Sequence, residues 1–226
     1  LTARRQDRLE ALATEITATR GARVEIATAD LRAPEGVDQL LGEIASRGLV
    51  VDTFVNNAGF GLRGRFAELP LEAQEEMLAL NIGALTRLSR KVLPDLIARG
   101  HGGIINVAST AAFQAGPNMA AYYASKAYVL SLSEALHEEA KPHGVVVTAL
   151  CPGPTQSEFA DVAGMDGSKL FRANAMKPRD VARAGVDGYL AGHAIVVPGL
   201  SNAIGVFAAG LLPRGFTRRV AGRLQA

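Results

Sequence analysis

The chain has one cysteine, no tryptophan and no group of histidines at metal-ligand spacing, and each absence excludes a class of protein. Cys151 alone cannot form an intrachain disulfide, which favours a cytoplasmic protein over a secreted, disulfide-stabilised one. The four histidines are scattered along the sequence, so we expect no bound metal. A net charge of +2 and an aromatic content of 5% give no basis for nucleic-acid binding.

Long apolar runs are absent as well. The longest, AIGVFAAGLL at 203–212, is far shorter than the roughly 20 residues that a membrane-spanning helix needs. No signal peptide opens the chain, so we expect no membrane-spanning segment. The first residues, LTARRQDRLE, have the pattern of an apolar strand that ends and leads into a helix. This pattern predicts that an upstream segment is missing.

Runs rich in β-branched residues alternate with longer segments of helical period along the whole chain. The runs lie at 23–30, 50–59, 102–110, 144–154 and 193–199. The helical segments lie near 4–19, 34–47, 70–99, 118–141 and 178–191. This alternation is typical of an α/β protein with a doubly wound parallel sheet and helices on both of its faces. At 226 residues, we expect one domain with three layers, α/β/α.

Four of the predicted strands end in small or polar residues. These ends are Asp30, the NNAG sequence at 56–59, Ser109 with Thr110, and the PGP sequence at 152–154. In an open parallel sheet the carboxyl ends of the strands meet at one crevice, where ligands bind. The sequence therefore predicts one ligand site at this edge of the sheet.

The stretch YYASKAY at 122–128 places two tyrosines before a lysine on a predicted helix. Tyr122 and Lys126, at positions i and i+4, are about 40° apart around the helix axis and can share a face. A nearby ammonium favours the phenolate and would lower the pKa of Tyr122 from about 10, giving a general acid/base. The spacing alone leaves open that the pair is a half-buried face without a catalytic role.

These motifs, in this order, resemble the classical short-chain dehydrogenase/reductase family, which has a Rossmann-like fold. The YYASK sequence is similar to the family's YxASK element, and Ser109 lies thirteen residues before Tyr122. Asn81 lies a further twenty-eight residues upstream. NNAG and PGPTQSEF, at 152–159, are similar to two further family motifs. FQAGPNMAAYYASKAY and the VVPG segment also resemble the bacterial DltE-like subgroup.

The resemblance implies a catalytic tetrad of Asn81, Ser109, Tyr122 and Lys126. Tyr122 would exchange a proton with the substrate oxygen, and Ser109 would hydrogen-bond that oxygen where negative charge develops. Lys126 would lower the pKa of Tyr122 and hold the nicotinamide ribose. Asn81 would sit in a local break of its helix that binds a water and links Lys126 to solvent. The alternative for Asn81 is an amide satisfied inside a packed helix pair.

The resemblance also implies the residues that bind a nicotinamide cofactor. Besides Tyr122 and Lys126, they are Asp30 and Leu31 at the adenine edge, Asn57, Ala58 and Gly59 on the adenine-ribose side, and Pro152, Gly153 and Thr155 near the nicotinamide. The sequence TARR at 2–5 carries no acidic residue that would repel a 2′-phosphate, and a guanidinium binds phosphate through paired hydrogen bonds. We therefore expect NADP(H) rather than NAD(H), with Arg4 as first choice and Arg5 as second, unless both are solvated residues at a helix start.

The sequence departs from the family at both ends. The family's first strand and glycine-rich TGxxxGxG turn are not in this sequence, so we expect them upstream. We assign residues 1–200 to the family's domain and residues 201–226 to an apolar and basic helical extension. The extension has no acidic residue and carries Arg214, Arg218, Arg219 and Arg223. It could contact an anionic membrane surface or form a packing or oligomer interface, and the sequence leaves both open.

The resulting hypothesis is an NADP(H)-dependent enzyme that interconverts a ketone or aldehyde and an alcohol by hydride transfer, as a cytoplasmic homodimer or homotetramer. The segment that corresponds to the family's lid over the substrate contains Met165, Leu170, Phe171 and Met176, which suggests a small to medium, apolar substrate. The alternative is a non-catalytic nucleotide-binding or scaffold protein that kept the fold.

Overall fold

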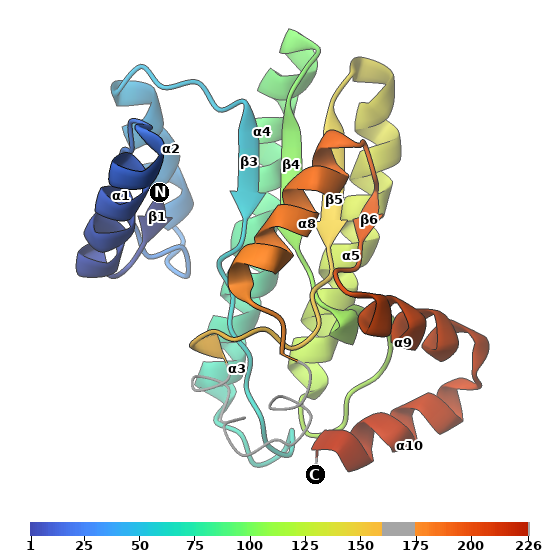
Figure 1. Ribbon diagram of the computed structural model, residues 1–226. Helices are drawn as coiled ribbons and strands as arrows, with labels where there is room; N and C mark the ends of the chain where they lie inside the picture. Colours follow the sequence, from blue (N-terminus) through green and yellow to red (C-terminus); the bar gives the residue numbers. More distant parts are fainter. Residues whose placement is uncertain (160–174, 226) are drawn as a thin grey trace. The chain divides into compact units, whose positions relative to one another are not determined.

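The computed structural model describes residues 1–159 and 175–225 and divides the chain into two compact units, Leu1–Val51 and Asp52–Ala226 (Figure 1). Each unit has its own parallel sheet, so the Rossmann-like α/β fold with parallel strands is confirmed. No strand among the described residues pairs with strands of both sheets. The boundary at residue 200 stays a prediction.

The first unit contains two short strands and two helices. They are β1 (Thr2–Ala3), α1 (Gln6–Arg20), β2 (Ala27–Thr28) and α2 (Gly36–Ser46). Thr2 pairs with Ala27, and Ala3 pairs with Thr28. A side chain at Gly36 would collide with the carbonyl oxygen of Asp30, so glycine allows the start of α2 to lie against the end of β2.

The second unit has four parallel strands in the order β3-β4-β5-β6. The strands are β3 (Thr53–Asn56), β4 (Gly103–Val107), β5 (Val146–Leu150) and β6 (Ile195–Val196). The connecting helices are α3 (Leu71–Leu78), η1 (Ala79–Ala84), α4 (Leu85–Arg99), η2 (Thr110–Phe113), α5 (Ala120–Ala140), η3 (Lys141–His143) and α8 (Pro178–Leu190). Two helices, α9 (Leu200–Leu211) and α10 (Arg214–Gln225), follow β6.

This second sheet is covered on both faces. Helices α4 and α5 pack on one face and α8 packs on the other, which gives three layers (Figure 1). Gly185 and Gly188 let α8 approach closely, because a side chain at either position would press into Leu150 or Val196. Burial on both faces accounts for the nearly continuous apolar sequence of the central strands.

A buried polar network that the sequence did not predict fixes the two strands nearest the site. The side-chain amide of Asn56 donates to Asn106 Oδ1 at 2.8 Å and to Ser89 Oγ at 3.1 Å. The amide of Asn106 donates to Ser133 Oγ at 2.9 Å. All four residues are buried, and a buried polar group without a partner costs about 1–3 kcal/mol. The network therefore holds β3 and β4 in register with α4 and α5.

Among the helices of residues 1–159 and 175–225, none is both long and apolar enough to cross a membrane. The same residues contain no group of three or more potential metal-ligating side chains.

Candidate active site

Three residues of the predicted tetrad lie together at the carboxyl end of β4. Ser109 directly precedes η2, and its Oγ accepts a hydrogen bond from the Ala111 amide at 3.1 Å. The Ser109 hydroxyl also hydrogen-bonds the phenol of Tyr122. Lys126, one turn along α5, places its Nζ 5.9 Å from the centroid of the Tyr122 ring. The structure thus brings Ser109, Tyr122 and Lys126 into one cluster.

The ammonium of Lys126 is buried and is oriented by the backbone of β4. Its Nζ donates to the carbonyl oxygen of Val107 at 2.8 Å. Burial, which disfavours the charged form, lowers the pKa of Lys126 to about 8. Near neutral pH the lysine is therefore still mostly protonated, but it loses its charge at a pH well below that of an exposed lysine.

The phenol of Tyr122 behaves opposite to the expectation from the sequence. Burial raises its pKa to about 12, while the hydrogen bond from Ser109 acts in the lowering direction. The prediction of a pKa below 10 for Tyr122 is therefore wrong for this structure. Desolvation is the largest influence, because burial disfavours the charged phenolate. At neutral pH Tyr122 holds its proton.

Asn81 lies in the predicted local break, which takes the form of a π-helical turn, η1, between α3 and α4. Its Oδ1 accepts from the Phe60 amide at 3.1 Å, and its Nδ2 donates to the Phe60 carbonyl at 2.9 Å. The same Nδ2 donates to Ser125 Oγ at 3.1 Å. The amide therefore fastens the segment after β3 to α5, and a role in proton relay stays a prediction.

Tyr123 belongs to an apolar cluster beside the site. Its ring meets that of Tyr122 edge-on, with centroids 6.1 Å apart, and a side chain at Gly116 would collide with it. The cluster also contains Met77, Ala111 and Met119. On the other side of Tyr122, the ring of Phe159 lies 5.4 Å away. Tyr123 thus packs, and Phe159 is a neighbour of Tyr122 that the sequence had not singled out.

The predicted cofactor residues of the second unit lie at the carboxyl ends of β3 and β5, on either side of β4. Asn57, Ala58 and Gly59 are exposed after β3. After β5, the carbonyl oxygen of Pro152 accepts from the Thr110 amide at 2.9 Å, which ties this turn to the end of β4. Thr155 Oγ1 donates to the Gly153 carbonyl at 3.0 Å.

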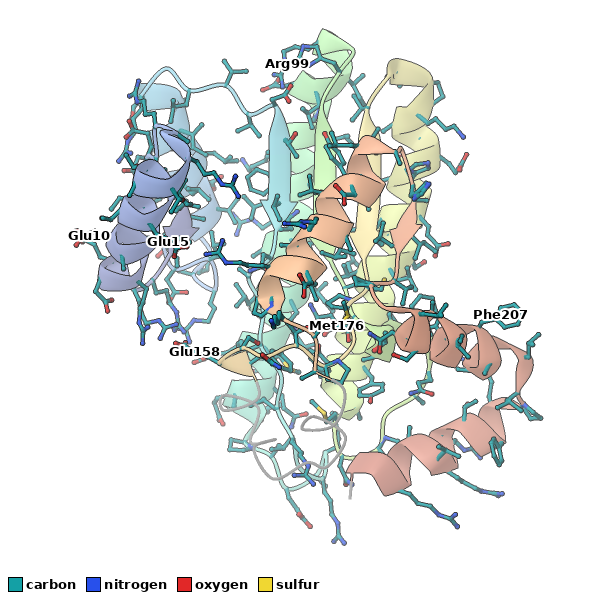
Figure 2. All side chains as sticks on the ribbon, in the orientation of Figure 1. Glu10, Glu15, Arg99, Glu158, Met176 and Phe207 are labelled. Carbon is teal, nitrogen blue, oxygen red and sulfur yellow. The ribbon has the colours of Figure 1, made fainter. Side chains whose placement is uncertain are left out.

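Gly153 lies against Asn202, a contact that the sequence did not predict. A side chain there would collide with the side-chain amide of Asn202, from α9. Asn202 Nδ2 donates to the Pro198 carbonyl at 2.7 Å and makes a longer contact of 3.7 Å to the sulfur of Met176, labelled in Figure 2. Met165, Leu170 and Phe171 of the predicted lid lie outside the described residues.

The first unit holds the other four predicted cofactor residues. Arg4 and Arg5 are exposed after β1, and Leu31 is buried. Asp30 forms a salt bridge with Arg32, with 2.7 Å between Nη2 and Oδ2. Hydrogen bonding from the Arg32 side chain holds the pKa of Asp30 at about 2. The sequence analysis had not considered Arg32 as the partner of this carboxylate.

Comparisons with known proteins agree with this geometry. A family model described as short chain dehydrogenase matches residues 1–166. "Probable oxidoreductase EphD" of Mycobacterium tuberculosis (strain ATCC 25618 / H37Rv) is 34% identical over 171 residues, 69% of this chain and 29% of EphD. "NADP-dependent 3-hydroxy acid dehydrogenase YdfG" of Escherichia coli (strain K12) is 35% identical over 192 residues, 81% of this chain and 75% of YdfG.

The chain thus spans only 29% of the length of EphD. Among solved structures, a short-chain dehydrogenase from Sphingobium yanoikuyae in complex with NADPH aligns with a TM-score of 0.81 and 31% identity. The alignment covers 93% of this chain and 84% of that one. The matched motifs, the parallel fold and the cluster around Tyr122 lead to one conclusion: this chain belongs to the short-chain dehydrogenase family.

Proposed function

We propose that this protein is an NADP(H)-dependent oxidoreductase that interconverts a ketone or aldehyde and an alcohol, with Tyr122 as general acid/base. The observation that carries the proposal is the buried Tyr122 phenol with Ser109 as its hydrogen-bond partner and Lys126 over its ring. The relative named as an NADP-dependent dehydrogenase and the neighbour in complex with NADPH support the choice of cofactor.

The residues after β3 suit a dinucleotide. A side chain at Gly59 would lie 2.9 Å from Asn81 Oδ1 and 3.6 Å from Lys126 Nζ, so glycine keeps the space beside the lysine open. Asn57 and Ala58, small and exposed, allow a ligand to approach the backbone. When bound, the nicotinamide cofactor supplies or accepts the hydride.

Proton transfer in the reduction direction follows from the protonation states. Tyr122 keeps its proton at neutral pH because its pKa is about 12, so it can donate that proton to the oxygen of a carbonyl substrate. The Ser109 hydroxyl, adjacent to the same phenol, donates a second hydrogen bond to that oxygen. The charge of Lys126 stabilises the phenolate that remains and holds the nicotinamide ribose. The apolar side chains around Tyr122 favour a small to medium, apolar substrate.

Arg4, with Arg5 as second choice, selects NADPH by binding the 2′-phosphate. Asp30 and Leu31 contact the adenine, and the salt bridge to Arg32 compensates the charge of Asp30, which would otherwise repel the phosphate. Pro152 and Gly153 shape the turn from which Thr155 binds the nicotinamide carboxamide.

We further propose that the family's first strand and glycine-rich turn lie upstream, and that the protein is of the DltE-like subgroup. Among the described residues, β1 pairs only with β2 and β3 only with β4, and such open strand edges in a sheet are normally covered. The intact mass of the natively expressed protein tests this proposal. A mass above 23.7 kDa supports it, and a mass of 23.7 kDa contradicts it.

The remaining proposals concern assembly and location. We expect a homodimer or homotetramer in the cytoplasm, in keeping with the single, buried Cys151. The extension at 201–226 makes a peripheral contact with a membrane.

The experiment that tests the function is steady-state NADPH oxidation by the full-length protein with a panel of ketones and aldehydes. We expect turnover with apolar carbonyl compounds that is lost in Tyr122→Phe. NADPH binding without turnover on any member of the panel would contradict the proposal and support the non-catalytic alternative.

A further inference from the structure

Helix α9 exposes a continuous apolar stripe. Leu200, Ile204, Phe207 and Leu211 are 78%, 59%, 70% and 72% exposed. At about 100° per residue, these four side chains fall within an arc of roughly 60° around the helix axis. Figure 2 shows Phe207 on the outer side of α9. A contiguous apolar surface of this kind marks a site of contact with another molecule or a membrane.

The opposite side of α9 is anchored, which fixes the stripe outward. The amide of Asn202 packs on Gly153 and donates to the Pro198 carbonyl, and the helix packs against η2. Rolling α9 to bury the stripe would break these contacts. The exposure of the stripe is therefore built into the fold of this unit.

The charged side chains from α9 onward are all positive. Helix α9 has no charged residue, and Asp187 is the last acidic residue of the chain. Four exposed arginines follow on α10: Arg214, Arg218, Arg219 and Arg223. Thr217 and Ala221 are buried, so the inner side of α10 is also anchored. Attraction between exposed charges acts over about 8 Å at physiological salt, so the arginines favour an anionic partner close to α10.

The size of the stripe argues against a second copy as its occupant. The four side chains of the stripe form a patch on the order of a few hundred Å². A stable protein interface needs about 800 Å² from each partner. A two-fold contact through this region would also bring two arginine-rich helices together. A bilayer requires no such area, because acyl chains and anionic headgroups match an apolar stripe beside positive charge.

We propose that α9 docks on an anionic lipid bilayer, with Leu200, Ile204, Phe207 and Leu211 entering the interfacial region and the α10 arginines attracting the headgroups. This inference rests on the proposed membrane contact of residues 201–226 and identifies the surface that makes it. The apolar stripe supplies the contact, and the arginines supply the preference for negative charge.

Co-sedimentation of the full-length protein with phosphatidylcholine vesicles, with and without phosphatidylglycerol, tests the proposal. We expect binding only to the anionic vesicles, weakened about tenfold or more in F207Q/L211Q, because two inserted side chains become polar. Arg219→Gln with Arg223→Gln should weaken binding and reduce its dependence on salt. The matched control is V50Q/L71Q, which changes two side chains of similar exposure elsewhere and should bind like the wild type.

Leu200→Gln alone is the second variant should the double variant unfold, and it should weaken binding in the same direction. Wild-type binding by both stripe variants would overturn the inference. If both stripe variants bound like the wild type but deletion of 201–226 abolished binding, residues 201–226 would contact the membrane without using the stripe on α9. A wild type that ignores vesicles but forms a dimer sensitive to F207Q/L211Q would also overturn it. NADPH turnover without vesicles should be unchanged in every substitution variant, which separates this test from that of the oxidoreductase.

Discussion

At the residue scale, Tyr122 and Tyr123 are neighbours, are both buried and are in ring contact, and the phenol of Tyr122 is hydrogen-bonded by Ser109. The helix spacing predicted which tyrosine would share a face with Lys126. The spacing could not predict the pKa of Tyr122 or of Lys126. Their burial and the direction in which Lys126 points depend on chain segments far away in the sequence. The pairing of Asp30 with Arg32 was missed for a similar reason, since it depends on a turn whose geometry the sequence does not define.

We expect the buried charge of Lys126 to destabilise the folded protein. Its pKa is about 8 in the folded state and 10.5 for an exposed lysine, so the folded protein binds this proton more weakly than the unfolded chain does. This loss of unfolding free energy is complete below pH 8 and disappears as the pH rises to about 10.5. Lys126→Met should therefore raise the free energy of unfolding at pH 7 by up to about 3 kcal/mol, at 1.4 kcal/mol per pKa unit.

Urea denaturation at pH 7 and pH 10.5 measures this difference. Lys91→Met, exposed on α4, is the control and should not gain stability at pH 7. A Lys126→Met protein that is less stable than the wild type at pH 7 would show that the bond to the Val107 carbonyl outweighs desolvation.

Arg4 should set cofactor preference. In Arg4→Ala we expect the Kd for NADPH to rise about tenfold or more, because a charge-assisted bond to the 2′-phosphate is lost, while the Kd for NADH stays unchanged. Fluorescence titration with both cofactors measures this, and Arg20→Ala, at the far end of α1, serves as control. Equal weakening of NADPH and NADH binding would remove Arg4 from phosphate recognition.

At the element scale, the helices were predicted closely, but the strands are shorter than their apolar runs. Residues 23–30 were predicted as one strand, and only Ala27–Thr28 pair within the sheet. Apolar pattern shows where a strand can lie, whereas strand length depends on the neighbour with which it pairs. The single helix predicted for 70–99 contains the π-turn at Asn81, which an apolar repeat alone does not reveal.

Asn81→Ala should loosen this turn. It leaves the Phe60 amide, the Phe60 carbonyl and Ser125 Oγ without their side-chain partner, and each buried unsatisfied group costs about 1–3 kcal/mol. We expect a loss of at least about 2 kcal/mol in unfolding free energy, measured by urea denaturation. Glu75→Ala, exposed on α3, should cost little. A change near zero in Asn81→Ala would mean that this amide does not anchor the segment after β3.

At the scale of the whole molecule, the sequence predicted that the strands are parallel and that candidate site residues follow their carboxyl ends. It did not predict the order of the strands in the sheet. The network of Asn56, Asn106, Ser89 and Ser133 could not be predicted, because four polar residues far apart in the sequence meet only after the layers pack.

The most direct test of the account compares NADPH-dependent carbonyl reduction by Tyr122→Phe and Tyr123→Phe in the full-length protein. Removing the Tyr122 hydroxyl should lower kcat by about 10²–10⁴-fold, because the proton donor is lost, with NADPH binding retained. Tyr123→Phe should keep most of the activity, since its ring packs against Gly116 and Tyr122. Loss of turnover in Tyr123→Phe together with activity in Tyr122→Phe would contradict the account.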